Sequence, residues 1–136
     1  MMILTKKLSS RQIDAMTYFA GRLLSPQMQR NVGVRVVIRR TMPVLGITII
    51  DDYNESGLPR MFTIEIDGKQ DNEEKLRTLA HEMVHVKQYC KKELNEEMSK
   101  WKGRDVDSDN IDYDDQPWEI EAHTLGDQLY EEFTCQ

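Results

Sequence analysis

The sequence has few of the features that mark disulfide-stabilised, membrane-spanning or secreted proteins. Its 136 residues include only two cysteines, Cys90 and Cys135, which fit a reducing compartment and cannot build a disulfide framework. No apolar run approaches the roughly 18–20 residues that a bilayer-spanning helix needs. The N-terminus places its lysines after a short apolar start, which is the wrong order for a secretory signal. We therefore expect a cytoplasmic protein with no membrane partner.

Basic residues are also outnumbered. The chain has 18 lysines and arginines against 24 aspartates and glutamates, a formal net charge of −6, and a pI near 5.1. A general nucleic-acid binder needs a net basic surface, so we expect no nucleic-acid partner. Hydrophobic residues make up 39% of the chain, enough for one small core, and we find no internal repeat or low-complexity linker. The sequence thus predicts a single domain over 1–136.

Apolar residues at helical spacing predict three helices. The first covers 8–24 and begins with a capping box between Ser9 and Gln12. The second runs from about 71 to about 92. The third begins at Pro117, a residue that suits the first turn of a helix.

Three runs rich in β-branched or alternating apolar residues predict strands, and they cover 34–39, 44–50 and 61–67. The run 44–50 is almost wholly apolar, which favours a central strand. The short connections between the runs favour an antiparallel meander. With the helices on either side in the chain, the expected fold is α+β, with a three-stranded, mainly antiparallel sheet.

The clearest chemical signal is the motif His81-Glu82-Met83-Val84-His85, which lies within the second predicted helix. Residues i and i+4 lie on one helix face, about 6 Å apart along the axis, so both imidazoles can reach one ion. Glu82 is one step round the helix, where it can hold a water against the ion and accept its proton. Zinc lowers the pKa of such a water towards about 7. The motif predicts one Zn²⁺ per chain, with His81 and His85 as metal ligands and Glu82 as the catalytic base.

A catalytic zinc needs a third protein ligand, and the segment 117–123 holds the candidates Glu119, Glu121 and His123. Helical phase does not separate the two glutamates, which flank the apolar stripe on opposite sides. Glu119 has His123 four residues on along the same face, an arrangement in which one side chain can support the other. We therefore predict Glu119, with Glu121 second and His123 third.

The segments 78–89 and 117–123 resemble the small zincin metallopeptidases, above all the compact, often phage-encoded HExxH proteins described as SprT-like. The second segment is also similar to the E-x-x-A-[N/D] helix of ImmA/IrrE-type and CAAX-processing gluzincins. The resemblance implies zinc on His81, His85 and Glu119, and Glu82 as base, in a minimal zincin whose C-terminal helix carries the third ligand. Where those gluzincins have Asn or Asp, this chain has His123, and a SprT-like pattern would make His123 the ligand.

We expect zinc-dependent hydrolysis of peptide bonds, with a protein or peptide as substrate and Glu82 activating the zinc-bound water. The location would be the cytoplasm, that of the host cell if the protein is phage-encoded. The strand at 62–66 is a candidate edge for holding an extended peptide. One alternative is a zincin-like module that binds metal or a partner without turnover, although the intact Glu82 argues against it. Another is a DNA-linked protease, which the net charge disfavours.

Three weaker signals have simpler interpretations. The segment 93–116 is irregular and acidic, and 105–116 resembles an EF-hand loop that lacks its glycine and its final glutamate, so we expect a solvated loop. Four arginines lie in or beside the predicted strand 34–39, where an exposed strand face is favoured over a binding patch; they are Arg30, Arg35, Arg39 and Arg40. Three tyrosines are candidates to donate a hydrogen bond to an oxyanion, namely Tyr89, Tyr113 and Tyr130.

Overall fold

The computed structural model describes residues 2–5 and 8–136, with side chains from Leu8 onward; residues 1, 6 and 7 of the N-terminal segment lie outside that description. The fold is α+β, as predicted. In chain order the elements are strand β1 (Met2–Thr5), helices α1 (Ser10–Leu23) and α2 (Pro26–Asn31), strands β2 (Gly33–Arg39), β3 (Gly46–Tyr53) and β4 (Pro59–Asp67), helix α3 (Asn72–Cys90), short strands β5 (Lys100–Trp101) and β6 (Arg104–Asp105), 3-10 turns η1 (Ser108–Asn110) and η2 (Tyr113–Asp115), and helix α4 (Pro117–Thr134).

The predicted helices are present, and their ends follow from local chemistry. Ser9 accepts a hydrogen bond from the backbone of Gln12, and the Gln12 side chain returns one to Ser9, which completes the predicted capping box. Asp71 caps α3, and Pro117 occupies the first turn of α4. Within the part of the chain that the structure describes, no helix has the length and apolar character to cross a membrane.

The order of the strands differs from the predicted meander. The sheet runs β1-β2-β4-β3, with β1, β2 and β4 parallel to one another and only β3 antiparallel to its neighbour β4. The three predicted strands are present as β2, β3 and β4, and β1 adds a fourth, but the prediction of a mainly antiparallel sheet is wrong because the sheet is mixed. A connection such as 40–45 can extend to about 20 Å, whereas skipping one strand position requires only about 10 Å. A short loop therefore does not force consecutive strands to pair.

The run 44–50 forms the edge of the sheet rather than its centre. Side chains near the start of β3 are 37–62% exposed, namely Val44, Leu45, Ile47 and Ile49. The candidate edge 62–66 instead lies inside the sheet as part of β4, hydrogen-bonded on both sides. Its inward side chains Phe62, Ile64 and Ile66 are fully buried, which explains why this strand takes the interior position.

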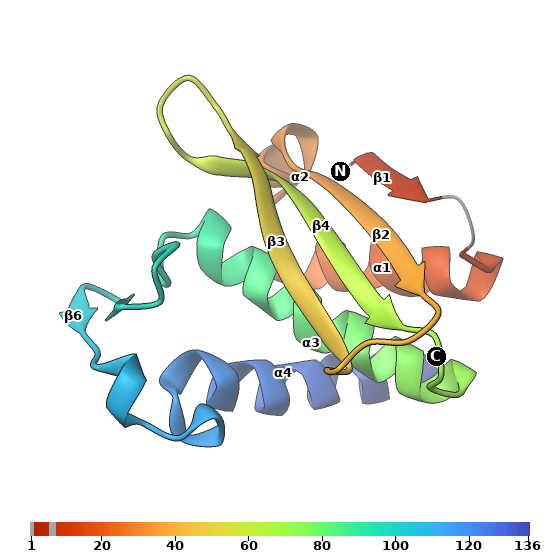
Figure 1. Cartoon of the computed structure of the whole chain (residues 1–136). Coiled ribbons are helices and arrows are strands. Elements are labelled where there is room, and N and C mark those ends of the chain that lie inside the picture. The colour runs from red at the N-terminus through yellow and green to blue at the C-terminus, as the bar shows by residue number, and fades with distance from the viewer. Residues whose placement is uncertain (1, 6–7) are drawn as a thin grey trace.

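Helix α3 occupies the middle of the molecule, between the sheet and α4 (Figure 1). Helix α1 packs beside α3 on the same side of the sheet. The core forms where these layers meet, and its largest fully buried side chains include Phe19, Phe62, Met83 and Trp118. The candidate ligands lie on α3 and α4, and these two helices pack directly against each other.

The α3–α4 crossing is close because Gly126 stands where the two backbones meet. A β carbon at this position would lie 3.1 Å from the Cα and 3.2 Å from the backbone nitrogen of His81. Contacts of that length with a backbone are repulsive, and the backbone of α3 cannot rotate away as a side chain would. The glycine therefore lets α4 approach the turn of α3 that carries His81.

We expect Gly126→Val to lower the free energy of unfolding by about 2 kcal/mol, because the added methyl groups force the helices apart. Gly21 is a matched control, since it is an exposed glycine inside α1 with no atom near a β carbon. Gly21→Ala should raise the free energy of unfolding by about 0.5–1 kcal/mol through helix propensity alone. Urea unfolding of both variants measures the two values; a Gly126→Val variant as stable as the parent would contradict the packing argument.

Candidate metal centre

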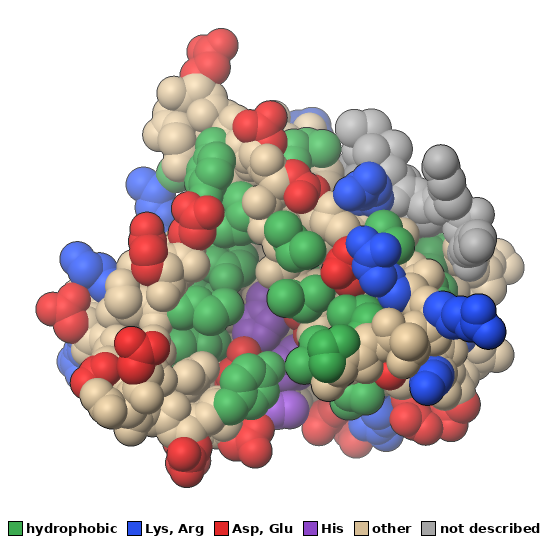
Figure 2. All heavy atoms as spheres, viewed as in Figure 1, with side chains coloured by type: hydrophobic (Ala, Val, Ile, Leu, Met, Phe, Trp, Pro, Cys, Tyr) green, Lys and Arg blue, Asp and Glu red, His purple; other side chains and the backbone are tan. Residues whose placement is uncertain are grey.

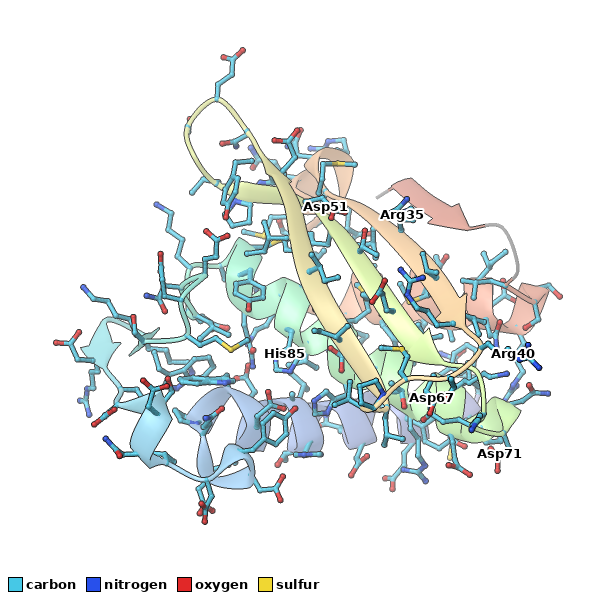
Figure 3. All side chains as sticks on the ribbon, in the orientation of Figure 1. Arg35, Arg40, Asp51, Asp67, Asp71 and His85 are labelled. Atoms are coloured by element: carbon cyan, nitrogen blue, oxygen red, sulfur yellow. The ribbon has the colours of Figure 1, made fainter. Side chains whose placement is uncertain are left out.

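Three side chains converge where α3 faces α4. The Nε2 atom of His81 lies 3.0 Å from Oε1 of Glu119, and the Nε2 atom of His85 lies 3.2 Å from Oε2 of the same carboxylate. Each of the three residues offers a ligand atom within 4.8 Å of the others, so together they can hold a metal ion. In Figure 3, His85 lies on α3 between the edge strand β3 and helix α4. The structure therefore brings together the three residues that the sequence predicted as ligands.

The orientation of His85 is determined by Gln88, one turn further along α3. The amide nitrogen of Gln88 donates to the backbone oxygen of Trp118 (3.0 Å) and to Oε1 of Glu121 (3.1 Å). Its amide oxygen consequently faces Nδ1 of His85 at 2.8 Å. An acceptor at this position assigns the imidazole proton to Nδ1, so in neutral His85 the lone pair is on Nε2.

The tautomer of His85 bears on whether the site suits a metal ion. In neutral His85 the Nε2 lone pair faces Oε2 of Glu119, and two acceptors 3.2 Å apart repel each other unless a cation lies between them. The cation can be a second proton on His85 or a metal ion. Ligand atoms around tetrahedral Zn²⁺ are separated by about 3.3–3.4 Å, given bond lengths of about 2.0–2.1 Å. The observed 3.0 and 3.2 Å are close to that spacing, and two imidazoles with one carboxylate are a donor set that zinc accepts.

The electrostatics agree with a site built for positive charge. Burial alone would raise the pKa of Glu119, but hydrogen bonds from His81 and His85 outweigh it and hold the pKa well below its usual range. Burial alone would lower the pKa of His85, but the hydrogen bond to Glu119 and the charges of Glu82 and Glu119 outweigh it and raise the pKa. Glu119 therefore stays ionised although it is only 2% exposed.

Glu82 lies beside the three convergent side chains without joining them. Its carboxylate accepts a hydrogen bond from the hydroxyl of Thr48 on β3, with 2.8 Å between Oε1 and Oγ1. Together with His81 it lines a cavity of about 340 Å³ between the start of β3, α3 and α4. Figure 2 shows histidine side chains at the bottom of a hollow that hydrophobic side chains border. The carboxylate is thus held next to the ligand set and at the wall of an open cavity.

The two other candidates for the third ligand have different surroundings. Glu121 also faces α3 but contacts other residues of it, accepting hydrogen bonds from Lys87 (2.8 Å) and Gln88. The ring of His123 lies 4.6 Å from that of His81, edge to face, and its side chain is 56% exposed at the cavity mouth. Glu121 therefore supports the residue behind His85, and His123 borders the cavity instead of joining the ligand group.

The three candidate tyrosines separate by position. Tyr113 lines the cavity, close enough to Glu119 that burial, the charge of this carboxylate and a hydrogen bond to it raise the tyrosine pKa. Tyr89 is buried and stacks on Phe62, with ring centroids 6.3 Å apart. Tyr130 donates instead to Glu73 and lies under Arg77. Of the three, only Tyr113 reaches the cavity.

The acidic segment and the arginines that the sequence analysis singled out contribute no ligand to the candidate metal centre. In the part of the chain that the structure describes, the acidic segment 105–116 contributes no group of three potential metal ligands. Arg35 donates to Thr63 and Arg39 pairs with Glu65 on the outer face of the sheet, as expected for an exposed strand face. In Figure 3, Arg35 and Asp51 are labelled on this face, far along the sheet from His85.

Sequence reasoning missed Thr48 and Gln88, which hold the carboxylate of Glu82 and the ring of His85. The role of Gln88 could have been predicted, because this residue follows His85 by three positions and therefore lies on the same face of the helix. The role of Thr48 could not have been predicted, since its partner Glu82 is 34 residues away and only the packing of β3 on α3 brings the two together.

We expect Gln88→Met to weaken binding of Zn²⁺, used here as the probe ion, by about 10- to 100-fold, because the imidazole of His85 loses its orienting partner. Gln128→Met is the matched control, as Gln128 is an exposed glutamine on α4 that bonds only to Glu132 among the described side chains. Competition with a chromophoric chelator measures both affinities. Equal affinity in the Gln88→Met variant and the parent would show that Gln88 does not orient the ligand.

Comparison of the chain with models of protein families, with curated proteins and with solved structures finds no match. The resemblance to zincin metallopeptidases therefore stays a prediction from the sequence motif around His81 and His85 and from Glu119.

Proposed function

We propose that this protein is a zinc-dependent metallopeptidase. The observation that carries the proposal is the placement of Glu82: an acidic side chain lies beside a group of two imidazoles and one carboxylate, is held by Thr48, and takes no part in the group itself. Three protein ligands leave a fourth position for a reacting molecule, which is typical of catalytic rather than structural zinc. A purely structural site has no use for an additional carboxylate at the wall of an open cavity.

The roles of the residues follow from their positions. His81, His85 and Glu119 would hold the ion, which when bound supplies a Lewis acid for the scissile carbonyl and makes water acidic enough to attack at neutral pH. Glu82 would accept the proton of the attacking water and deliver it to the leaving amine nitrogen. Tyr113 and His123 border the cavity on the side opposite β3, where their polar groups can contact the substrate.

The neighbouring edge strand supports a peptide as the substrate. Strand β3 ends the sheet, so its outer backbone edge has no partner strand among the described residues. The exposed Val44 and Leu45 at its start also line the cavity that contains His81 and Glu82. An extended peptide added along this edge would form backbone hydrogen bonds with β3 and pass the candidate metal centre. We therefore propose β3 as the edge that holds the peptide, in place of the segment 62–66, which lies inside the sheet.

Replacement of the proposed base separates catalysis from metal binding. Glu82→Gln keeps the shape of the side chain and can still accept a hydrogen bond from Thr48, but its amide cannot accept a proton. We expect this variant to bind about one zinc ion per chain and to cleave peptides at least about 10²-fold more slowly, measured with a peptide library and by metal analysis. Glu131→Gln, at an exposed site on α4, is the control and should match the parent. Full activity in Glu82→Gln would refute the assigned mechanism, and zinc bound without any cleavage by the parent would favour a non-catalytic module.

Removal of a ligand should abolish the metal dependence of stability. Zinc binds only the folded chain, so adding it should raise the melting temperature of the parent. We expect no such rise for His85→Ala or for Glu119→Ala, whereas His123→Ala should retain it. Differential scanning calorimetry with and without zinc provides the comparison. A zinc response that survives in Glu119→Ala but disappears in His123→Ala would identify His123 as the third ligand.

A further inference from the structure

We propose that Thr48 is a positioning residue that orients the carboxylate of Glu82 from the edge strand β3; the inference rests on the proposed function of Glu82. The hydroxyl of Thr48 lies 2.8 Å from Oε1 of Glu82 and 3.1 Å from the backbone oxygen of the same residue. A hydroxyl has one proton, and donation to an ionised carboxylate is the stronger of the two interactions. The bond occupies Oε1 and leaves Oε2 of Glu82 available to the cavity.

The contact is specific because strand and helix approach closely at this point. A β carbon at Gly46, two residues before Thr48 on the same face of β3, would lie 2.6 Å from Cγ2 of Thr78 and 3.2 Å from Cγ of Glu82. Only glycine allows the strand to reach the helical turn that carries Glu82. Gly46 therefore leaves room for the strand to approach Glu82, and Thr48, two residues later on the same face, donates its hydroxyl to the Glu82 carboxylate.

A second link secures the start of β3 to the same helix. The side chain of Gln70 donates to the backbone oxygen of Leu45 (3.1 Å) and accepts a hydrogen bond from Thr78 of α3 (2.6 Å). Gln70 is buried, so these bonds are protected from water. Strand β3 is consequently attached to α3 on either side of Gly46, which gives the hydroxyl of Thr48 a defined position relative to Glu82.

Loss of the Thr48 hydroxyl should change the position of the Glu82 carboxylate. Without the donor, the Glu82 carboxylate loses the hydrogen bond that selects its rotamer, so fewer molecules hold it where it can accept the proton of an attacking water. Because Thr48 contacts none of His81, His85 and Glu119 in the described hydrogen bonds, the metal ligands should be unaffected. The predicted effect is therefore on turnover and on ligands that contact Glu82, and not on zinc content.

The test compares Thr48→Val, which keeps the shape without the hydroxyl, with Thr48→Ser, which keeps the hydroxyl. Thr63→Val is the matched control, because the Thr63 hydroxyl donates to Asp51 on the outer face of the neighbouring strand. All three zinc-loaded variants are examined by crystallography for the position of Glu82, by calorimetry for binding of acetohydroxamic acid, and by steady-state kinetics with a library-derived peptide. Acetohydroxamic acid is a suitable probe because it binds zinc and donates a hydrogen bond to a carboxylate beside the ion.

In Thr48→Val we expect zinc stoichiometry unchanged, the Glu82 carboxylate displaced or spread over several rotamers, and hydroxamate affinity and kcat each lower by about tenfold with KM little changed. Thr48→Ser and Thr63→Val should resemble the parent. A Glu82 carboxylate that keeps its position in Thr48→Val, or equal losses in the Ser and Val variants, would overturn the proposal. If the parent cleaves no peptide, the proposed hydrolysis fails, while the crystal structures and the hydroxamate affinities still decide the role of Thr48.

Discussion

A carboxylate buried between two imidazole rings is the constraint to which the rest of the structure conforms. Glu119 is only 2% exposed, and an ionised carboxylate removed from water costs several kcal/mol unless charge and hydrogen bonds compensate. The Nε2 atoms of His81 and His85, with a proton or a metal ion, supply that compensation. They can do so only if α3 and α4 lie close together, which is why Gly126 meets the backbone of His81.

Behind this centre lies a row of polar side chains that has no contact with the cavity. Gln88 orients His85, Glu121 receives the amide of Gln88, and Lys87 pairs with both Glu121 and Glu93. Burial would lower the pKa of Lys87, but the hydrogen bonds and charges of Glu121 and Glu93 outweigh it and raise the pKa. These ion pairs and hydrogen bonds offset part of the cost of removing the charged groups from water.

On the other side of α3, the strand that contacts Glu82 is the edge strand β3 and not a central strand of the sheet. Strand β3 is the antiparallel partner of β4 in an otherwise parallel sheet, and it runs next to the turn of α3 that carries Glu82. Its inward positions Gly46 and Thr48 contact the helix, whereas its outward apolar side chains remain exposed. The same strand thus donates a hydrogen bond to a carboxylate on one face, and under the proposed function its outer edge, which has no partner strand among the described residues, would receive an extended peptide.

Local chemistry was sufficient for the sequence to predict the helices, the caps at Ser9 and Pro117, and the candidate ligands His81 and His85. The capping box at Ser9, the Pro117 start and the i, i+4 spacing of the histidines depend on residues within one or two turns of each other, so their geometry follows from the helix alone. The choice among Glu119, Glu121 and His123 depended on which face of α4 meets α3, a contact across more than 30 residues of chain. The strand order was also decided by packing. The buried side chains of β4 needed neighbours on both sides, and loop length did not specify which strand would provide them.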